Sequence, residues 1–141
     1  MPALKRPKPR KPGFRERVLG MLGVMSKKEV DHLIWLEEQV SNFIEKKAVS
    51  EELEELLQGL YNPFFGERWR AAWLIGELKD KKAVPILVKA LRDTDPGVRF
   101  AVAGALRKIG GKEAKSALTS ALKKEKTKFV EDEIKKALKK W

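Results

Sequence analysis

A stretch of 31 residues occurs twice in direct succession, as residues 68–98 and 99–129 of a chain of 141 residues. Arg68 is matched by Arg99, Ala72 by Ala103 and Leu87 by Leu118, and the apolar positions between them recur at helical spacing. A unit of this size cannot bury its apolar stripe alone, so successive copies must stack on one another. The sequence therefore predicts an all-α fold, a short α-solenoid of about seven helices stacked in pairs.

The region before the two copies is predicted to hold a further helix pair. Ser26 followed by Glu29 is a capping box, and apolar spacing predicts a helix over 27–47 and a second one after Ser50. A shift of 31 residues aligns this helix pair with the repeat that begins at Arg68. The pair is therefore interpreted as a diverged copy of the same unit. Later in the chain, Asp95 is expected to cap a helix that Gly110 and Gly111 end, and a half-repeat after Thr127 closes the stack.

Two regions are predicted along the chain. Residues 1–25 are interpreted as a basic, proline-rich arm followed by a short apolar segment, and residues 26–141 as the repeat domain. Four prolines within residues 1–13 prevent helix and sheet, so the arm is expected to be disordered alone or ordered by a partner, with a reach of roughly 40 Å.

The net charge of +11 is distributed unevenly. Residues 1–17 carry +6, residues 27–67 carry −6 and residues 68–141 carry +11, which predicts a molecule that attracts polyanions at both ends of its chain. The chain has no cysteine and no apolar run long enough to cross a bilayer, so a cytoplasmic protein without a membrane span is expected. Few Asn and Gln beside abundant Lys and Glu are typical of proteins from hot environments.

The first copy reads R-x-x-A-A-x-L-I-G-E-L-x-D-x-x-A-V-P-x-L-x-x-A-L, followed by D-x-D-P-x-V-R. This pattern resembles HEAT-like repeats of the type found in phycobilisome lyases, well over residues 62–125 and weakly over 27–61 and 126–141. The resemblance implies a right-handed α-solenoid built from HEAT-like pairs. It also implies a structural polar ladder between repeats, involving Arg68, Arg99, Asp93 and Asp95.

Few residues support an enzyme, and none is assigned a catalytic role. His32 is the only histidine and is expected to be a surface or boundary residue, and no cluster has the spacing of metal ligands or of a phosphate-binding loop. No cofactor or metal is therefore expected. A runner-up arises from the resemblance to DNA glycosylases built from related repeats, with Trp69, Trp73, Arg70 and Asp80 in such roles, but the chain has too few repeats to wrap a duplex.

Two tryptophans of the first copy receive different interpretations. Trp69 aligns with Phe100, and a large apolar residue at the same place in both copies is expected to be part of the core. Trp73 aligns with Gly104 and is expected to be partly exposed, either as a contact for a protein partner or packed against the neighbouring repeat.

The preferred hypothesis is a non-catalytic protein that binds RNA, such as rRNA, or another polyanion within a ribosomal or other ribonucleoprotein particle. The second helix of each pair is expected to line the inner surface and to contact phosphates. The predicted nucleic-acid contacts are Lys5, Arg6, Lys8, Arg10, Lys11, Arg15, Arg17, Lys82, Lys89, Lys112, Lys115 and Lys123.

The alternative is a protein–protein adaptor or scaffold for an acidic partner, with Trp73 as its contact. Seven carboxylates of residues 27–67 would repel phosphates and leave this face free for a protein neighbour. They are Glu37, Glu38, Glu45, Glu51, Glu52, Glu54 and Glu55. The sequence leaves the identity of the RNA, the particle and the oligomeric state open.

Overall fold

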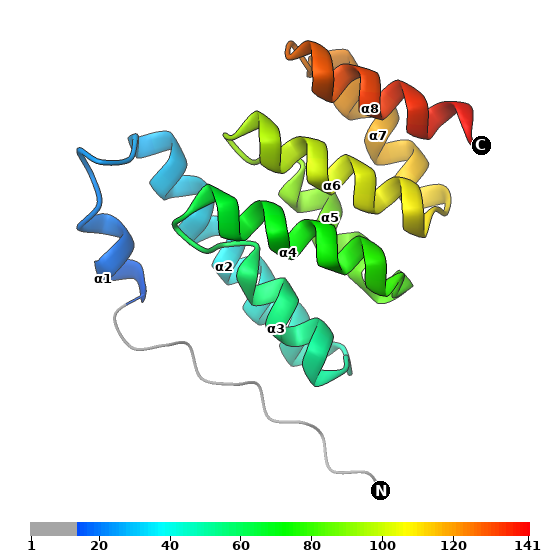
Figure 1. Ribbon diagram of the computed structural model, residues 1–141. Helices are drawn as coiled ribbons and strands as arrows, with labels where there is room; N and C mark the ends of the chain where they lie inside the picture. Colours follow the sequence, from blue (N-terminus) through cyan, green and yellow to red (C-terminus); the bar gives the residue numbers. More distant parts are fainter. Residues whose placement is uncertain (1–13) are drawn as a thin grey trace, which may run out of the picture.

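The computed structural model describes residues 14–141, which form eight α-helices and one short 3-10 helix (Figure 1). The elements are α1 (Phe14–Leu19), α2 (Lys27–Lys46), α3 (Glu51–Gly59), α4 (Phe65–Leu78), η1 (Lys81–Ala83), α5 (Val84–Ala90), α6 (Pro96–Ile109), α7 (Lys112–Lys124) and α8 (Lys128–Lys139). The predicted all-α solenoid is confirmed.

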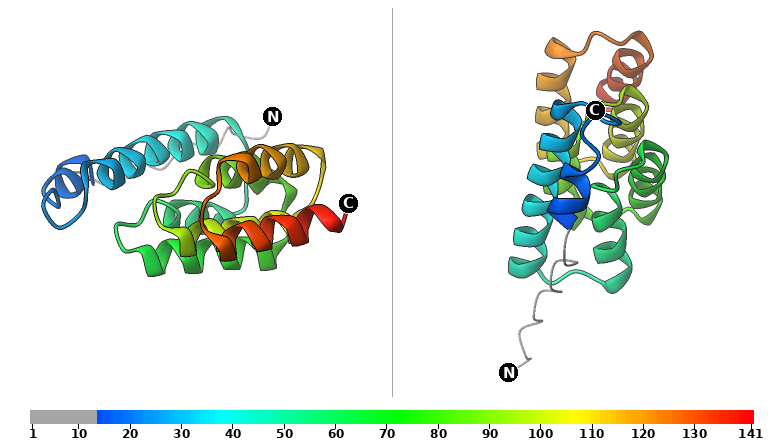
Figure 2. Two further views of the ribbon diagram at one scale, coloured as in Figure 1. Left: turned by 90° about the horizontal axis from the view of Figure 1, so that it is seen from above. Right: turned by 90° about the vertical axis from the view of Figure 1, so that its left-hand side faces the viewer.

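The helices lie in two layers. Figure 2 shows α4, α6 and α8 side by side in one layer and α2, α5 and α7 in the other. Their facing sides enclose one continuous apolar core, in which Ile75, Leu87, Leu106 and Leu118 are fully buried. The second copy of the repeat therefore stacks on the first as the 31-residue register predicts.

The predicted helix starts and stops are also confirmed. The Ser26 side chain accepts a hydrogen bond from the backbone N–H of Glu29 at 3.2 Å, and Asp95 caps α6 by accepting one from Val98 at 3.0 Å. Gly110 and Gly111 have φ angles of 78° and 102°, a region that glycine adopts at little cost, so α6 can end and α7 can begin within two residues.

The first helix pair differs from the later ones, and its interpretation as a copy of the same unit is wrong. By register, α2 would correspond to α4 and α3 to α5, but α3 lies beside α4 in its layer and α2 shares the layer of α5 and α7 (Figures 1 and 2). Apolar periodicity shows which side of a helix is buried, and it says nothing about the layer to which the helix belongs. Close packing fixes this placement, because a Cβ on Gly59 of α3 would lie 2.8 Å from the Cβ of Ala71 in α4.

Helix α1 is the eighth helix, where about seven had been expected. Its Phe14 and Val18 side chains are buried against Met25, Val30 and Leu33, and the Phe14 ring contacts Tyr61 edge-on at 5.1 Å. Helix α1 falls in the segment 1–25 that the sequence analysis separated from the repeat domain. It was not predicted because six residues are too few to show a helical period. Within the described residues, no helix is long and apolar enough to span a membrane.

The α4 and α6 helices approach each other closely at one glycine. A Cβ on Gly76 would lie 2.8 Å from the Cα of Ala105 and 3.0 Å from its Cβ. Only a residue without a side chain fits between these two backbones. This contact sets the distance between the two copies of the repeat.

Candidate binding surfaces

The predicted polar ladder is present at the first repeat junction, where Arg68 meets Asp93. Arg68 Nε lies 2.9 Å from Asp93 Oδ2 and Nη2 lies 3.3 Å from Oδ1, and both side chains are almost fully buried, at 3% and 0% exposed. Arg68 also donates to the carbonyl oxygens of Asn62 and Pro63 at 2.9 and 3.0 Å. Asp93 Oδ1 accepts from the N–H of Asp95, so the pair joins the start of α4 to the turn that begins α6.

The second ladder uses Arg99, as predicted, with a partner that the sequence analysis missed. Arg99 forms a bidentate pair with Glu125, at 2.9 Å from Nε to Oε2 and 3.0 Å from Nη2 to Oε1. The Glu125 carboxylate accepts from the Thr127 N–H two residues on, as Asp93 does from Asp95. The signal was available, because Glu125 stands 32 residues after Asp93 and just before the next helix.

Helix α2 covers the first ladder with the only histidine of the chain. His32 Nε2 lies 3.6 Å from Asp93 Oδ2, beyond hydrogen-bond reach, and its side chain is 8% exposed. Burial raises the pKa of Asp93, but the neighbouring His32 and Arg68 side chains lower it more, so its pKa lies below the ordinary value of 3.8. His32 is a boundary residue, as expected, and Arg68, Asp93, Arg99 and Asp95 are structural.

The five lysines predicted to line the inner surface divide into two groups. Lys82 Nζ donates to the carbonyl oxygen of Ala48 at 3.0 Å and Lys89 Nζ donates to Gln39 Oε1 at 2.7 Å, so both are tied to the α2 segment. A continuous row of free lysines is therefore not formed. The cause is the placement of α2 beside α5, which the sequence did not predict.

The other three lysines, Lys112, Lys115 and Lys123, form an exposed patch on α7. At 3.6 residues per turn they fall within roughly 80° of the helix circumference, on a different side from the buried Ala114 and Leu118. Among residues 14–141, none of the three makes an ion pair with a carboxylate. We call this patch the basic face.

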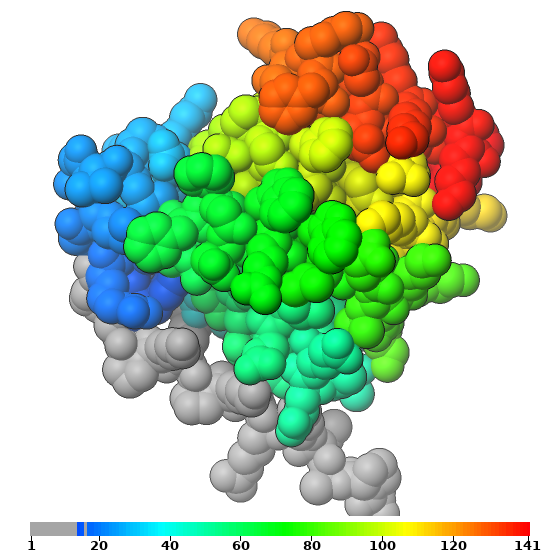
Figure 3. Space-filling model, viewed as in Figure 1, coloured from blue at the N-terminus to red at the C-terminus, as the bar shows by residue number. Residues whose placement is uncertain are grey.

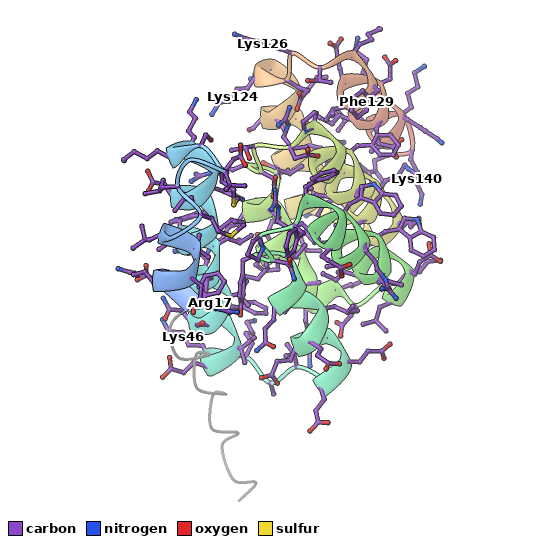
Figure 4. All side chains as sticks on the ribbon, turned by 60° about the vertical axis from the view of Figure 1, so that its left-hand side comes forward. Arg17, Lys46, Lys124, Lys126, Phe129 and Lys140 are labelled. Atoms are coloured by element: carbon purple, nitrogen blue, oxygen red, sulfur yellow. The ribbon has the colours of Figure 1, made fainter. Side chains whose placement is uncertain are left out.

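Further lysines extend the positive charge around this end of the molecule. Figure 4 shows Lys124, at the end of α7, and Lys126, in the turn before α8, pointing outward. Of the remaining predicted contacts, Arg15 and Arg17 are exposed on α1. Lys5, Arg6, Lys8, Arg10 and Lys11 lie outside the described residues.

The prediction that Trp69 belongs to the core is wrong. Trp69 is 41% exposed, and Phe100, its equivalent in the next copy, also lies on the surface, at 36%. The 31-residue match between two aromatic residues thus marks a repeated surface position. Trp73 is 44% exposed, as expected, and its ring is also covered on one side by Lys108 Nζ, 5.0 Å from the ring centroid.

These side chains belong to a row of exposed aromatic residues on the layer of α4, α6 and α8. Phe65, Trp69 and Trp73 follow one another at four-residue spacing on α4, which places them on one side of that helix. Phe100 on α6 and Phe129 on α8 continue the row, with their ring centroids 5.8 Å apart. We call these five residues the aromatic face; Figure 3 views the layer that carries it from the outside.

The acidic surface is smaller than predicted. Glu37 and Glu54 are buried, and Glu37 accepts a hydrogen bond from Ser41 Oγ at 3.1 Å. Glu54 lies inside because α3 packs against both α2 and α4. The other five predicted carboxylates are exposed.

A groove of about 460 Å³ is lined by residues of α3 and α4. Leu56, Ala71 and Leu74 contribute apolar lining, and Arg70 and Glu67 place charges of both signs at its edge.

Asp80, to which the resemblance to DNA glycosylases gave a functional role, instead caps η1 by accepting a hydrogen bond from the N–H of Lys82 at 2.9 Å. Residues 14–141 contain no group of three or more His, Cys, Asp or Glu side chains arranged to hold a metal ion.

Comparison with known proteins gives one match. Residues 53–139 match the family described as HEAT repeats, a range that covers most of α3 and all of α4 to α8. No curated protein and no solved structure matches the chain.

Proposed function

Because the chain belongs to the HEAT repeat family, we propose that it is a non-catalytic binding scaffold whose basic face on α7, together with the basic residues 1–17, binds RNA. HEAT repeats stack into extended surfaces suited to binding large partners, which supports the general part of this proposal. The particular ligand is inferred from charge.

The observation that carries the proposal is the difference between the free and the paired cations. Arg68, Arg99 and Arg107 are held by buried or half-buried carboxylates, which leaves their charge balanced within the protein. The three lysines of the basic face have no such partner in the described part of the chain. Lysine ammonium groups held on one rigid helix attract a phosphate backbone without reading its sequence.

The setting we propose is a ribosomal or other ribonucleoprotein particle. A basic arm rich in proline can follow a folded RNA while the repeat domain stays on its surface. The N-terminal segment carries seven of the basic side chains, and its composition alone supports this step.

Salt dependence of RNA binding tests the proposal. Replacing Lys112, Lys115 and Lys123 together by Gln removes up to three phosphate contacts, so the slope of log K against log salt should flatten by about 2 to 3. The matched control replaces Lys28, Lys46 and Lys47, three exposed lysines of the α2 segment, by Gln and changes the net charge equally. An equal loss of slope in both variants would show that only net charge matters and would overturn the site.

The arm is tested separately with a chain that lacks residues 1–13. The deletion ends before Phe14 because this side chain is part of the core around α1. A flatter slope than that of the full chain is expected, and an unchanged slope removes the arm from RNA binding.

The second candidate function, an adaptor for an acidic protein, is favoured by the exposure of Trp73. Trp73→Ala tests the adaptor separately from RNA binding. Loss of a protein partner in this variant would support the adaptor, whereas loss of RNA affinity only in the lysine variant supports RNA binding.

A further inference from the structure

We propose that the aromatic face on α4, α6 and α8 is a docking surface for an amphipathic helix of a partner protein, and that a carboxylate of this helix pairs with Arg70. This surface lies on the opposite layer from the basic face, so the inference goes beyond the RNA function and does not depend on it.

Large aromatic side chains are exposed on the layer of α4, α6 and α8. Five such residues are gathered on one layer of a small domain, and each is between 36% and 62% exposed. Contiguous apolar surface of this kind marks interaction sites, and Trp is the residue most enriched among the side chains that dominate binding energy. The core does not need these aromatic side chains, because Ala71, Ala72 and Ile75 of α4 are the residues buried in it.

Charge distinguishes this surface from a nucleic-acid site. Three of the cations next to the aromatic face are matched by carboxylates, in the pairs Lys108–Glu77, Arg107–Glu133 and Lys128–Asp132. These pairs lower the positive charge beside the aromatic face, unlike the basic face of α7, whose three lysines are unpaired within the described residues. A phosphate backbone would meet no row of free cations on α4 and α6. An apolar protein segment would instead contact the five aromatic side chains.

Among the described residues, Arg70 is an unpaired cation on α4, and it indicates the charge of the partner. It stands three residues before Trp73 on α4, is exposed, and makes no ion pair within residues 14–141. A guanidinium beside apolar surface binds a carboxylate in a bidentate manner as that surface loses water. The partner should therefore carry Asp or Glu at the edge of its apolar side.

The shape of the surface favours a helix as the docked element. Phe65, Trp69 and Trp73 run along α4 over about 12 Å, which is the length of two turns of a partner helix. Gly104 of α6 is the repeat equivalent of Trp73 and leaves a bare position one turn after Phe100. A Cβ there would meet only Glu133 Oε1, at an ordinary 3.5 Å, so packing within the protein does not require this glycine. A partner side chain can enter there as a ridge enters a groove between packed helices.

Photo-crosslinking in the cell tests the proposal with the full chain. Trp69 is replaced by p-benzoylphenylalanine, and the exposed Lys47 on the α2 side carries the same group in a matched control. Mass spectrometry of the Trp69 product should find a segment of another protein with apolar residues at helical spacing and a flanking carboxylate. Crosslinks to RNA, to a second copy of this chain or to a segment without these features would overturn the proposal, as would yields no higher than at Lys47.

A synthetic peptide of the crosslinked segment then gives the energetic test by calorimetry. Trp73→Ala should weaken binding by about tenfold or more, and Gly104→Leu should do the same by filling the bare position. Arg70→Glu should also weaken binding, and reversing the peptide's carboxylate to Lys should restore it. Replacing Lys112, Lys115 and Lys123 should leave peptide affinity unchanged while it weakens RNA binding. Equal affinity of the wild type, Trp73→Ala and Gly104→Leu would contradict the docking surface.

Discussion

The junction between α4 and α6 and the junction between α6 and α8 contain the same arginine–carboxylate ladder in different surroundings. At the first, Arg68 and Asp93 are sealed beneath α2, with His32 above the carboxylate. At the second, Arg99 is 20% exposed and Glu125 7%, and helix α2 does not reach this far along the stack. The same kind of ion pair is present at both junctions, but water reaches only the second one.

This difference shows what a flanking helix adds to a repeat protein. A buried ion pair must replace all its lost hydration with protein contacts, and Arg68 does so with two backbone carbonyls and both oxygens of Asp93. A partly exposed pair keeps some water and depends less on its partner. The first junction should therefore be the more sensitive of the two to mutation.

The largest effect is expected from removing the carboxylate at the first junction. Asp93→Ala leaves Arg68 buried without a counter-charge and should lower the free energy of unfolding by about 3–5 kcal/mol. Glu125→Ala should cost less, about 1–2 kcal/mol, because Arg99 can turn to solvent. Urea unfolding of both variants measures the difference. Equal losses would mean that the cover of α2 has no energetic consequence.

The next effect concerns the distance between helices at the two junctions. Gly76→Ala pushes a Cβ against the backbone of Ala105 and should destabilise the protein by about 1–2 kcal/mol despite the better helix propensity of Ala. Gly104→Ala, at the α6–α8 side, places its Cβ at an ordinary contact distance of 3.5 Å from Glu133 Oε1 and should stabilise the protein by up to about 1 kcal/mol. Thermal unfolding of the two variants should shift in opposite directions. An unchanged or raised unfolding temperature of Gly76→Ala would show that the first junction can widen at little cost.

The smallest effect is expected at acid pH. Burial raises the pKa of Glu125, but its hydrogen bond with Arg99 and further hydrogen bonds lower it more, so that both Glu125 and Asp93 have a pKa below the ordinary value. The unfolded chain then binds more protons, so the stability that the two carboxylates contribute is complete above about pH 5 and is lost as the pH falls through their folded pKa values. Asp93→Asn and Glu125→Gln should each flatten the fall in stability between about pH 5 and pH 3. A profile unchanged in both variants would contradict the lowered pKa values.

Sequence reasoning predicted the repeated part of the fold well. Register and capping are local properties, and the sequence therefore gives both the 31-residue period and the caps at Ser26 and Asp95. It placed Arg68, Asp93 and Arg99 in a ladder because the pattern resembled a family. It missed Glu125, whose repeat shift is 32 residues instead of 31.

The surfaces were harder to predict, because exposure depends on how whole helices are placed. Trp69 and Phe100 are one repeat apart, and this spacing is the same whether the two side chains are buried or exposed. The alignment of the two copies therefore could not reveal the aromatic face. The position of α2 decided that Lys82 and Lys89 are tied to its residues while Lys112 is free. No local pattern indicated in which layer α2 would lie.

Lysine reactivity toward an acylating reagent, measured by mass spectrometry on the protein bound to its cellular RNA and on the free protein, tests the central claim most directly. The account predicts that Lys112, Lys115 and Lys123 become protected in the bound protein, while Lys28, Lys46 and Lys47 keep the reactivity they have in the free protein. Unchanged reactivity on α7, or protection confined to α2, would contradict it.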